Sequence, residues 1–191
     1  LGQRTGMKNE DNGLWPQREP GPLAAILGGR VDQFYAIDDK PGDTVPVTGV
    51  WGTTTSKIWA EQLSTTAPDT QVLMRYGKSN GWLDGKPAAI TRKVGKGSIT
   101  YIGAWMDDAT MLKAAEWMAK TSGVTPAFGP VPAGVDVYPR EGNGKKIFIL
   151  VNFNKNTQTV PLPSTMHGVL NDKDLSSVTL NRYGVAVLQA K

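Results

Sequence analysis

The chain of 191 residues contains no cysteine and a single histidine, His167. Without cysteine there can be no disulfide, no thiolate metal site and no cysteine nucleophile. One histidine without a cluster of further ligands does not make a zinc or iron site, so we expect no metal and no cofactor. The compartment stays open, because cysteine-free proteins occur both inside and outside cells.

Long apolar runs and concentrated charge are also missing. No stretch approaches the roughly 20 apolar residues of a transmembrane helix, and no signal peptide is visible. The net charge is +4, and basic residues occur only in short groups such as those at 92–93 and 145–146. Nucleic-acid binding needs a basic patch or stripe, so we predict neither a nucleic-acid nor a membrane partner. The chain does not begin with Met, which suggests a fragment or a processed product.

The acidic residues show no catalytic pattern. A glycosidase needs two carboxylates that face each other across the scissile bond. Neighbours such as Asp38 and Asp39, or Asp107 and Asp108, diverge on a strand or in a turn, so we expect them to be solvated or to cap a helix. The Gly-Lys-Gly turn at 95–97 joins two strands, whereas a phosphate loop joins a strand to a helix. The sequence therefore predicts no catalytic residue.

The first two-thirds of the chain predict a mixture of strands and short helices. Apolar runs and alternation between turn signals predict strands over 31–37, 45–50, 57–65, 71–76, 86–93 and 98–104. A short helix is the alternative over 57–65, because Glu, Gln and Leu are helix formers. Turns are expected at 38–43 and 94–97.

Two helices are expected, over 23–27 and over 109–120. Gly28 and Gly29 end the first, and the acidic side chains at 107 and 108 suit the amino end of the second. Helical spacing predicts that one side of the second helix faces the core, with the residues Met111, Leu112, Ala115, Met118 and Ala119.

The last third of the chain has a different pattern. Three prolines and two glycines make 125–134 the best linker in the sequence. Beyond it the apolar period becomes two, and Asn143-Gly144 is a hairpin signal. We predict domains at 1–124 and 135–191, the second a small antiparallel β domain with strands at 135–138, 146–152, 157–162, 166–170, 177–180 and 185–189.

The stretch 76–108 resembles part of a known family. It combines a strand that starts Pro-Ala, a Gly-Lys-Gly turn, a strand that ends Tyr-Ile-Gly and an acidic helix start. This order is similar to the middle, or trimerisation, domain of bacterial β-galactosidases of glycoside hydrolase family 42. The opening Leu1–Glu10, the segment 20–31 and the ending Leu180–Leu188, which resembles the family's small C-terminal β domain, extend the resemblance over most of the chain.

The resemblance implies a fold in the α+β or α/β class. It implies a partial sheet like that of class I glutamine amidotransferases, which is flavodoxin-like, with few helices, followed by a small antiparallel β-sandwich-like domain. Leu1 would then end a strand whose preceding units are missing. The amidotransferase triad of Cys, His and Glu is excluded, because the chain has no cysteine.

The resemblance also implies a role. The chain would be the non-catalytic C-terminal portion of a β-galactosidase, inactive without the N-terminal catalytic barrel, while the parent acts on β-galactoside sugars. The family's trimers imply a homo-oligomer, and a soluble bacterial protein, cytoplasmic rather than secreted, is expected. The candidates for assembly lie in the opening loops and are Arg4, Thr5, Trp15, Pro20 and Leu23.

Two other functions stay open: a free-standing carbohydrate-binding module and a general α+β interaction domain. Sugar-binding modules use exposed tryptophans, and we expect Trp51 and Trp82 to be exposed candidates for sugar contact, whereas Trp105 and Trp117 are expected in the core. Trp15 is either a sugar or partner contact or an anchor that holds its loop on the core.

Overall fold

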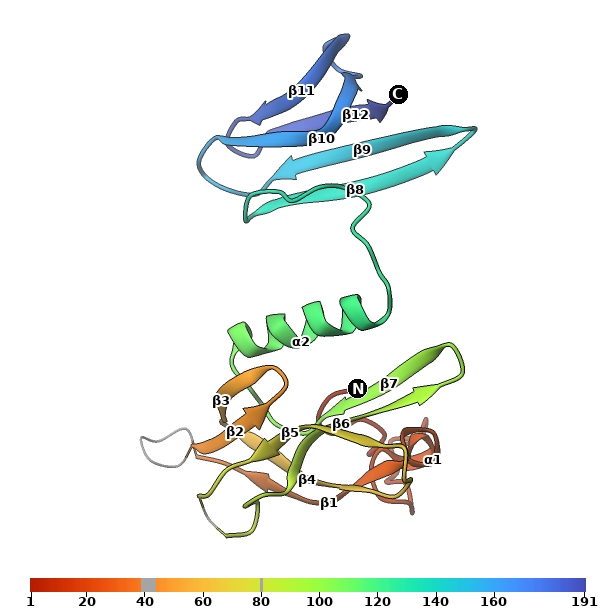
Figure 1. Cartoon of the computed structure of the whole chain (residues 1–191), viewed down its shortest axis with the longest axis vertical. Helices are drawn as coiled ribbons and strands as arrows, with labels where there is room; N and C mark the ends of the chain where they lie inside the picture. Colours follow the sequence, from red (N-terminus) through yellow and green to blue (C-terminus); the bar gives the residue numbers. More distant parts are fainter. Residues whose placement is uncertain (39–43, 80) are drawn as a thin grey trace. The chain divides into compact units, whose positions relative to one another are not determined.

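In the computed structural model the chain forms two compact units, Leu1–Val124 and Thr125–Lys191. The structure describes residues 1–38, 44–79 and 81–191, so most of the turn predicted at 38–43, including Asp39, lies outside the described residues. Strands dominate both units, and the fold is mostly β with few helices (Figure 1). Among the described residues, no helix is both long enough and apolar enough to cross a membrane.

The first unit starts with an irregular loop and then a 3-10 turn and a short helix. Its elements are η1 (Gly21–Leu23), α1 (Ala24–Leu27), β1 (Gly29–Ala36), β2 (Val45–Gly49), β3 (Gly52–Ser56), β4 (Trp59–Thr65), β5 (Gln71–Tyr76), β6 (Pro87–Val94), β7 (Gly97–Ile102) and α2 (Asp108–Thr121). The strand prediction over 57–65 is confirmed, and its helical alternative is wrong. The hairpin of β6 and β7 is also confirmed, with Val94 paired to Gly97.

Strand β3 was not predicted, because its sequence Gly-Thr-Thr-Thr-Ser carries no apolar alternation. It is a strand because it pairs with β2 from Val45↔Ser56 to Gly49↔Gly52. Asp107, the N-cap of α2, accepts hydrogen bonds from the Thr54 hydroxyl and from the Thr110 N–H. Pairing with β2 and the hydrogen bond from Thr54 to Asp107 thus decide the conformation of this segment, and both partners lie outside it.

The strands of the first unit form two sheets. Strands β1 and β4 pair with each other, and a second sheet has the order β3-β2-β5-β6-β7. Every strand pair recorded in these two sheets is antiparallel. Short connections suffice for such pairs, and the described strand pairs do not confirm the flavodoxin-like arrangement that the resemblance implied.

Helix α2 presents a different side to the core than the spacing predicted. Thr110 and Ala114 are buried, and Met118 packs against the core at its margin. Met111 and Leu112 are 40% and 61% exposed, and Ala115 and Ala119 are exposed as well. The prediction is therefore confirmed for Met118 and wrong for the other four. Apolar residues occupy two adjacent stripes of this helix, and the stripe with the small side chain of Ala114 allows the closer approach.

The second unit is one antiparallel sheet. Its strands are β8 (Val135–Gly142), β9 (Lys145–Asn152), β10 (Gln158–Gly168), β11 (Lys173–Leu180) and β12 (Val185–Ala190), in the order β11-β10-β12-β9-β8. The hairpin predicted at Asn143-Gly144 is confirmed, and both residues have positive φ. The described strands of this unit include no second sheet, so the sandwich-like arrangement is not confirmed.

Strand β10 joins two strands that were predicted separately, 157–162 and 166–170. Its first half pairs with β11 up to Pro161, and its second half pairs with β11 and β12 from Met166. The register shifts between these two residues, where Pro161 and Pro163 have no N–H to donate. The prolines therefore bend the strand without ending it.

The segment 125–134, predicted as a linker, contributes to the core of the second unit. Phe128 is 7% exposed, and its ring meets that of Phe148 edge to face with centroids 5.0 Å apart. The same cluster contains Leu150 and Leu188. This segment thus belongs structurally to the β unit.

The replacement Phe128→Ala should destabilise the second unit by about 3–4 kcal/mol, because it removes a large buried ring and leaves a cavity. All six tryptophans lie in the first unit, so tryptophan fluorescence during urea unfolding follows that unit alone. Amide NMR signals from residues 135–190 follow the second unit and should disappear at a lower urea concentration, while the fluorescence transition stays unchanged.

Phe153→Ala is the matched control, because Phe153 is 57% exposed. Equal loss of stability in the two variants would contradict the anchoring role of Phe128.

Candidate functional site

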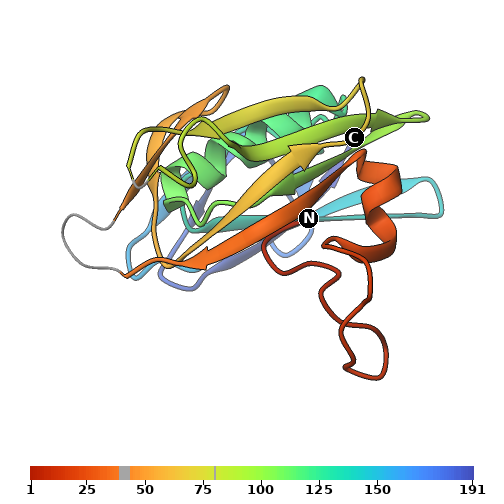
Figure 2. The same cartoon turned by 90° about the horizontal axis from the view of Figure 1, so that it is seen from below.

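The opening loop of the first unit, residues 1–20, lies beside β1 and α1 (Figure 2). It is attached to β1 by main-chain pairing, since the Val31 N–H donates to the Glu19 carbonyl at 2.7 Å. Arg18 also donates to the carbonyl of Asp32 at 2.9 Å and to its carboxylate at 3.2 Å. The loop therefore has a defined position along the edge of β1.

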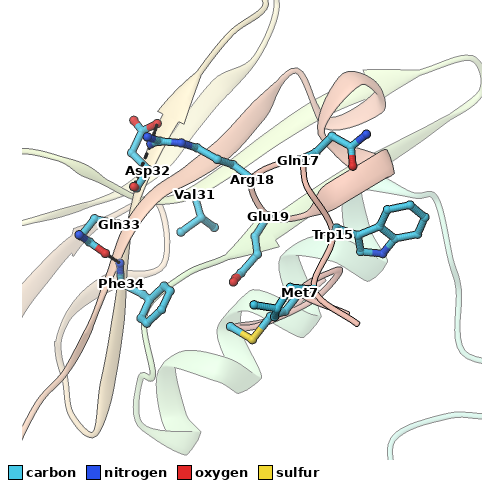
Figure 3. A pocket seen from close by; sticks show the side chains of 10 residues that line it. Met7, Trp15, Gln17, Arg18, Glu19, Val31, Asp32, Gln33 and Phe34 are labelled. Atoms are coloured by element: carbon cyan, nitrogen blue, oxygen red, sulfur yellow. Dashed lines mark hydrogen bonds and ion pairs between the residues drawn. The ribbon is translucent and has the colours of Figure 1, made fainter. Parts of the chain in front are cut away.

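A pocket of about 360 Å³ lies between this loop and β1 (Figure 3). We call it the loop pocket. Its surface is mostly apolar, and five of the residues that line it are polar. The residues that line it are Met7, Leu14, Trp15, Gln17, Arg18, Glu19, Val31, Asp32, Gln33 and Phe34.

The carboxylate of Glu19 points into the loop pocket (Figure 3). Glu19 is only 9% exposed, and its Oε2 is buried without a hydrogen-bond partner. Burial raises the pKa of this carboxyl, and the nearby carboxylate of Glu61 raises it further, whereas Arg4 opposes both effects. A buried acceptor without a donor is unusual in a folded protein.

Glu61, in the middle of β4, is completely buried. Its Oε1 accepts hydrogen bonds from the Arg4 backbone N–H and from Trp59 Nε1, both at 2.9 Å. Its Oε2 accepts one from the Tyr101 hydroxyl at 2.7 Å. The Tyr76 hydroxyl donates to the Glu61 carbonyl at 3.0 Å. One carboxylate thereby joins the opening loop to β4 and β7.

Burial raises the pKa of the Glu61 carboxyl, although hydrogen bonds from Trp59, Tyr101 and the Arg4 backbone act in the opposite direction. Desolvation disfavours the charged form, and these donors restore only part of the lost hydration. The pKa of Tyr101 is also raised, by burial and then by the adjacent Glu61 charge. Glu61 and its hydrogen-bond donors Arg4, Trp59 and Tyr101 therefore form a structural joint, a buried group that links the opening loop to β4 and β7 away from water.

Neither Glu19 nor Glu61 stands out in the sequence. Glu19 stands in a stretch rich in charge and proline. Glu61 is placed by strand alternation on the same face as Trp59 and Leu63. A carboxylate between two large apolar residues on one strand face was the only signal, and it does not identify the donors.

The predicted assembly residues gather around the opening loop. The Arg4 guanidinium lies over the Trp59 ring, 5.5 Å from its centroid. Trp15 donates from Nε1 to the Lys8 carbonyl at 3.1 Å and lines the loop pocket. The Thr5 hydroxyl accepts from the Gly2 N–H at 3.2 Å, Pro20 is buried, and Leu23 ends η1. Their contact with another subunit remains a prediction.

Gly6, which follows Arg4 and Thr5 in the opening loop, occupies a position that requires glycine. Its φ is +71°, and a Cβ there would overlap the backbone carbonyl of Pro20. A Cβ on Gly21 would in turn lie 2.8 Å from the Gly6 carbonyl oxygen and 3.2 Å from the Trp15 ring. Two backbone segments therefore meet where only glycine fits.

The two candidates for sugar contact have different environments. Trp51 is 3% exposed and meets Trp117 edge to face at 5.9 Å, so the prediction that Trp51 is exposed is wrong. Trp117 packs against the core, as expected, but Trp105 is 52% exposed, and its core prediction is wrong. Trp82 is 66% exposed with its ring stacked on Tyr35 at 5.6 Å. The neighbouring Asn80 lies outside the described residues.

His167 lies in the second unit, on β10. Its Nε2 is 3.5 Å from the Asp172 carboxylate, and its Nδ1 is 3.8 Å from that of Asp174. Within residues 1–38, 44–79 and 81–191, no group of three or more His, Asp or Glu side chains is arranged to hold a metal ion.

Comparison with known proteins identifies the family to which this chain belongs. A family model described as the β-galactosidase trimerisation domain matches residues 1–125, and one described as the β-galactosidase C-terminal domain matches residues 134–190. The chain belongs to glycoside hydrolase family 42. Together the two models span almost the whole sequence, and the loop pocket and Glu61 both lie in the trimerisation domain.

The relatives are all longer than this chain. β-Galactosidase Bga of Halorubrum lacusprofundi is 32% identical over 74% of the chain, which spans 21% of Bga. β-Galactosidase BglY of Alicyclobacillus acidocaldarius is 27% identical over 97% of the chain, which spans 28% of BglY. The crystal structure of a β-galactosidase from Bacillus circulans superposes over the whole chain with a TM-score of 0.84 at 23% identity, and the chain spans 28% of it.

Glu61→Ala should lower the free energy of unfolding of the first unit by about 3–5 kcal/mol. Three donors would lose their acceptor, among them the fully buried Tyr101 hydroxyl, and each unmatched buried group costs about 1–3 kcal/mol, partly offset by relaxation. Glu61→Gln should cost much less, because its oxygen can accept from Arg4 and Trp59 while its amide donates to the Tyr101 oxygen. Urea unfolding followed by tryptophan fluorescence measures both, and equal losses would contradict the proposed hydrogen-bond joint.

The stability of the first unit should depend on pH through Glu19 and Glu61. The folded chain holds these protons more tightly than the unfolded chain, because both pKa values are raised. The stability that these two groups contribute should therefore fall as the pH rises above the ordinary glutamate pKa of about 4.3. Urea unfolding between pH 4 and pH 8 tests this slope.

The double variant of Glu19→Gln with Glu61→Gln is the control for that measurement. It should flatten the pH dependence at the same ionic strength. A slope that persists in the double variant would assign the effect to other groups.

Proposed function

We propose that this chain is the non-catalytic C-terminal portion of a β-galactosidase-like glycoside hydrolase, in which it serves assembly and structural support. The observation that carries the proposal is the match of residues 1–125 to the trimerisation-domain model. The chain spans 21% and 28% of the two relatives named above. That difference in length leaves room for a catalytic barrel in the parent, which would act on β-galactosides.

The chemistry of the described residues supports inactivity of the chain alone. A retaining glycosidase places two carboxyl groups about 5–5.5 Å apart on either side of an accessible bond. Glu61 is completely buried, and its two oxygens are occupied by three donors. It is unsuited to reach a substrate, and Glu19 alone makes no such pair.

We also propose that the first unit is part of an amidotransferase-like, flavodoxin-like domain in the parent. The outer edge of β7 supports this. The amino group of Leu1 donates to the Thr100 carbonyl at 2.8 Å, and the Ile102 N–H donates to the Leu1 carbonyl at 3.1 Å. These two bonds on either side of one residue have the pattern of a parallel pair. A strand running into Leu1 in the parent would lie parallel to β7.

The same family membership supports a soluble and cytoplasmic parent, as the resemblance implied. It also supports a homotrimer, since the matching model is named for trimerisation. The residues before Gly123 would make the contacts between subunits.

Light scattering of the purified chain should give a mass three times that of the chain at high protein concentration. Closed rings of identical subunits bury matching surfaces, and a specific interface buries at least about 1,000 Å². The same sample should not hydrolyse a chromogenic β-galactoside. A monomer at every concentration, or turnover that survives purification and is lost on replacing one acidic residue, would contradict the proposal.

A further inference from the structure

The loop pocket contains an acceptor that the described residues leave without a donor. Glu19 is nine-tenths buried, its Oε2 has no hydrogen-bond partner, and its carboxylate points into the pocket (Figure 3). A buried carboxylate is unfavourable unless it is paired or hydrogen-bonded. The geometry therefore leaves a place for a donor that comes from outside this fold.

The nearest cations of the same chain are already engaged. Arg18 and Arg30 both contact the carboxylate of Asp32, at 3.2 and 2.9 Å. The Arg4 guanidinium lies over the Trp59 ring. Within the described part of the chain, no ion pair reaches Glu19. Asp32 thus has ion-pair partners, whereas Glu19 has only the more distant electrostatic influence of Arg4, which partly opposes the rise in its pKa.

The walls of the loop pocket suit a long side chain with an apolar stem. Met7, Val31 and Phe34 provide apolar surface, and the Trp15 ring lies on the opposite side from Phe34 (Figure 3). Lysine and arginine bury their methylene stems against such surface and attract aromatic faces through their charge. The volume of about 360 Å³ is sufficient for one such side chain.

The wall is held rigidly. Phe34 stacks on Trp59 with ring centroids 5.1 Å apart and planes 17° from parallel. Trp59 in turn donates to Glu61. An incoming side chain would therefore meet a surface that is already in position, which reduces the entropy cost of binding.

We propose that the loop pocket receives a lysine or arginine side chain from a second copy of this chain, with Glu19 as its counter-ion. This inference rests on the proposed assembly function and names the surface that carries it. The pocket lies within the residues matched by the trimerisation-domain model. A second copy also carries Lys and Arg side chains, so it can supply a cation of the required kind.

The form of the contact agrees with a trimer. A pocket on one subunit filled by a different surface of the next is a heterologous contact, and such contacts close into rings when the rotation allows. A two-fold dimer would instead place the same patch on both sides of the interface. The pocket thus suits a closed ring of subunits, and a trimer is one such ring.

Sedimentation velocity on the whole chain tests the assignment through Glu19→Gln. Removal of one charge from a buried pair should weaken each interface and raise its dissociation constant at least about tenfold. The monomer should keep or gain thermal stability, because an uncharged amide replaces a carboxylate that the fold leaves unpaired. A purely structural Glu19 would change stability without changing assembly.

Phe34→Ala provides a second variant, since Phe34 is 43% exposed and its loss leaves the core intact. It removes the apolar wall and should also weaken assembly. Glu141→Gln is the matched control, because Glu141 is an exposed glutamate in the second unit, and it should leave assembly unchanged.

The outcomes separate this inference from the proposed function. Trimers as tight as wild type in both Glu19→Gln and Phe34→Ala would overturn the pocket assignment and leave assembly intact. Weakening in Phe34→Ala alone would indicate an apolar occupant and overturn the cationic one. A wild-type chain that stays monomeric at all concentrations would overturn both.

Discussion

The structure of the first unit depends on one buried carboxylate. Glu61 brings together a backbone N–H of the opening loop, an indole N–H of its own strand and a hydroxyl from β7. A carboxylate has capacity for all three donors, and a neutral acceptor of the same size has less. Desolvation makes the buried charged group unfavourable. The hydrogen bonds from its three donors offset part of this cost.

This joint determines the shape of the molecular surface nearby. Arg4 is held by its backbone, which places its guanidinium on Trp59, and Trp59 supports Phe34 at the wall of the loop pocket. The close approach of Gly6 to Pro20 fixes the other side of the loop. A segment rich in glycine and proline is thereby ordered by tertiary contacts, which is the condition for a loop to serve as a specific interface.

Each of the two units has its own hydrophobic core. The second unit buries one cluster around Phe148 and Leu150, to which Phe128 contributes. The first unit buries two clusters, one around Met74 and Tyr76 and one around Leu63 and Tyr101. Separate cores let each unit be stable by itself, and the interface features discussed above all belong to the first.

The sequence by itself determined the features that rest on neighbouring residues. The β6–β7 hairpin, the capped start of α2 and the Asn143-Gly144 turn follow from local backbone preferences, and the ordered motifs were enough to indicate the family. About the candidate site it indicated the opening loop, through Arg4 and Trp15, but neither of its carboxylates.

Tertiary structure alone decided what depends on partners distant in sequence. Strand β3 exists because β2 pairs with it, and α2 covers Trp51 with a stripe that its spacing did not select. Glu61 acquires its role from donors 57 and 40 residues away. Periodicity reports which residues can share a face, whereas burial and hydrogen-bond partners are set by the elements that come to lie against that face.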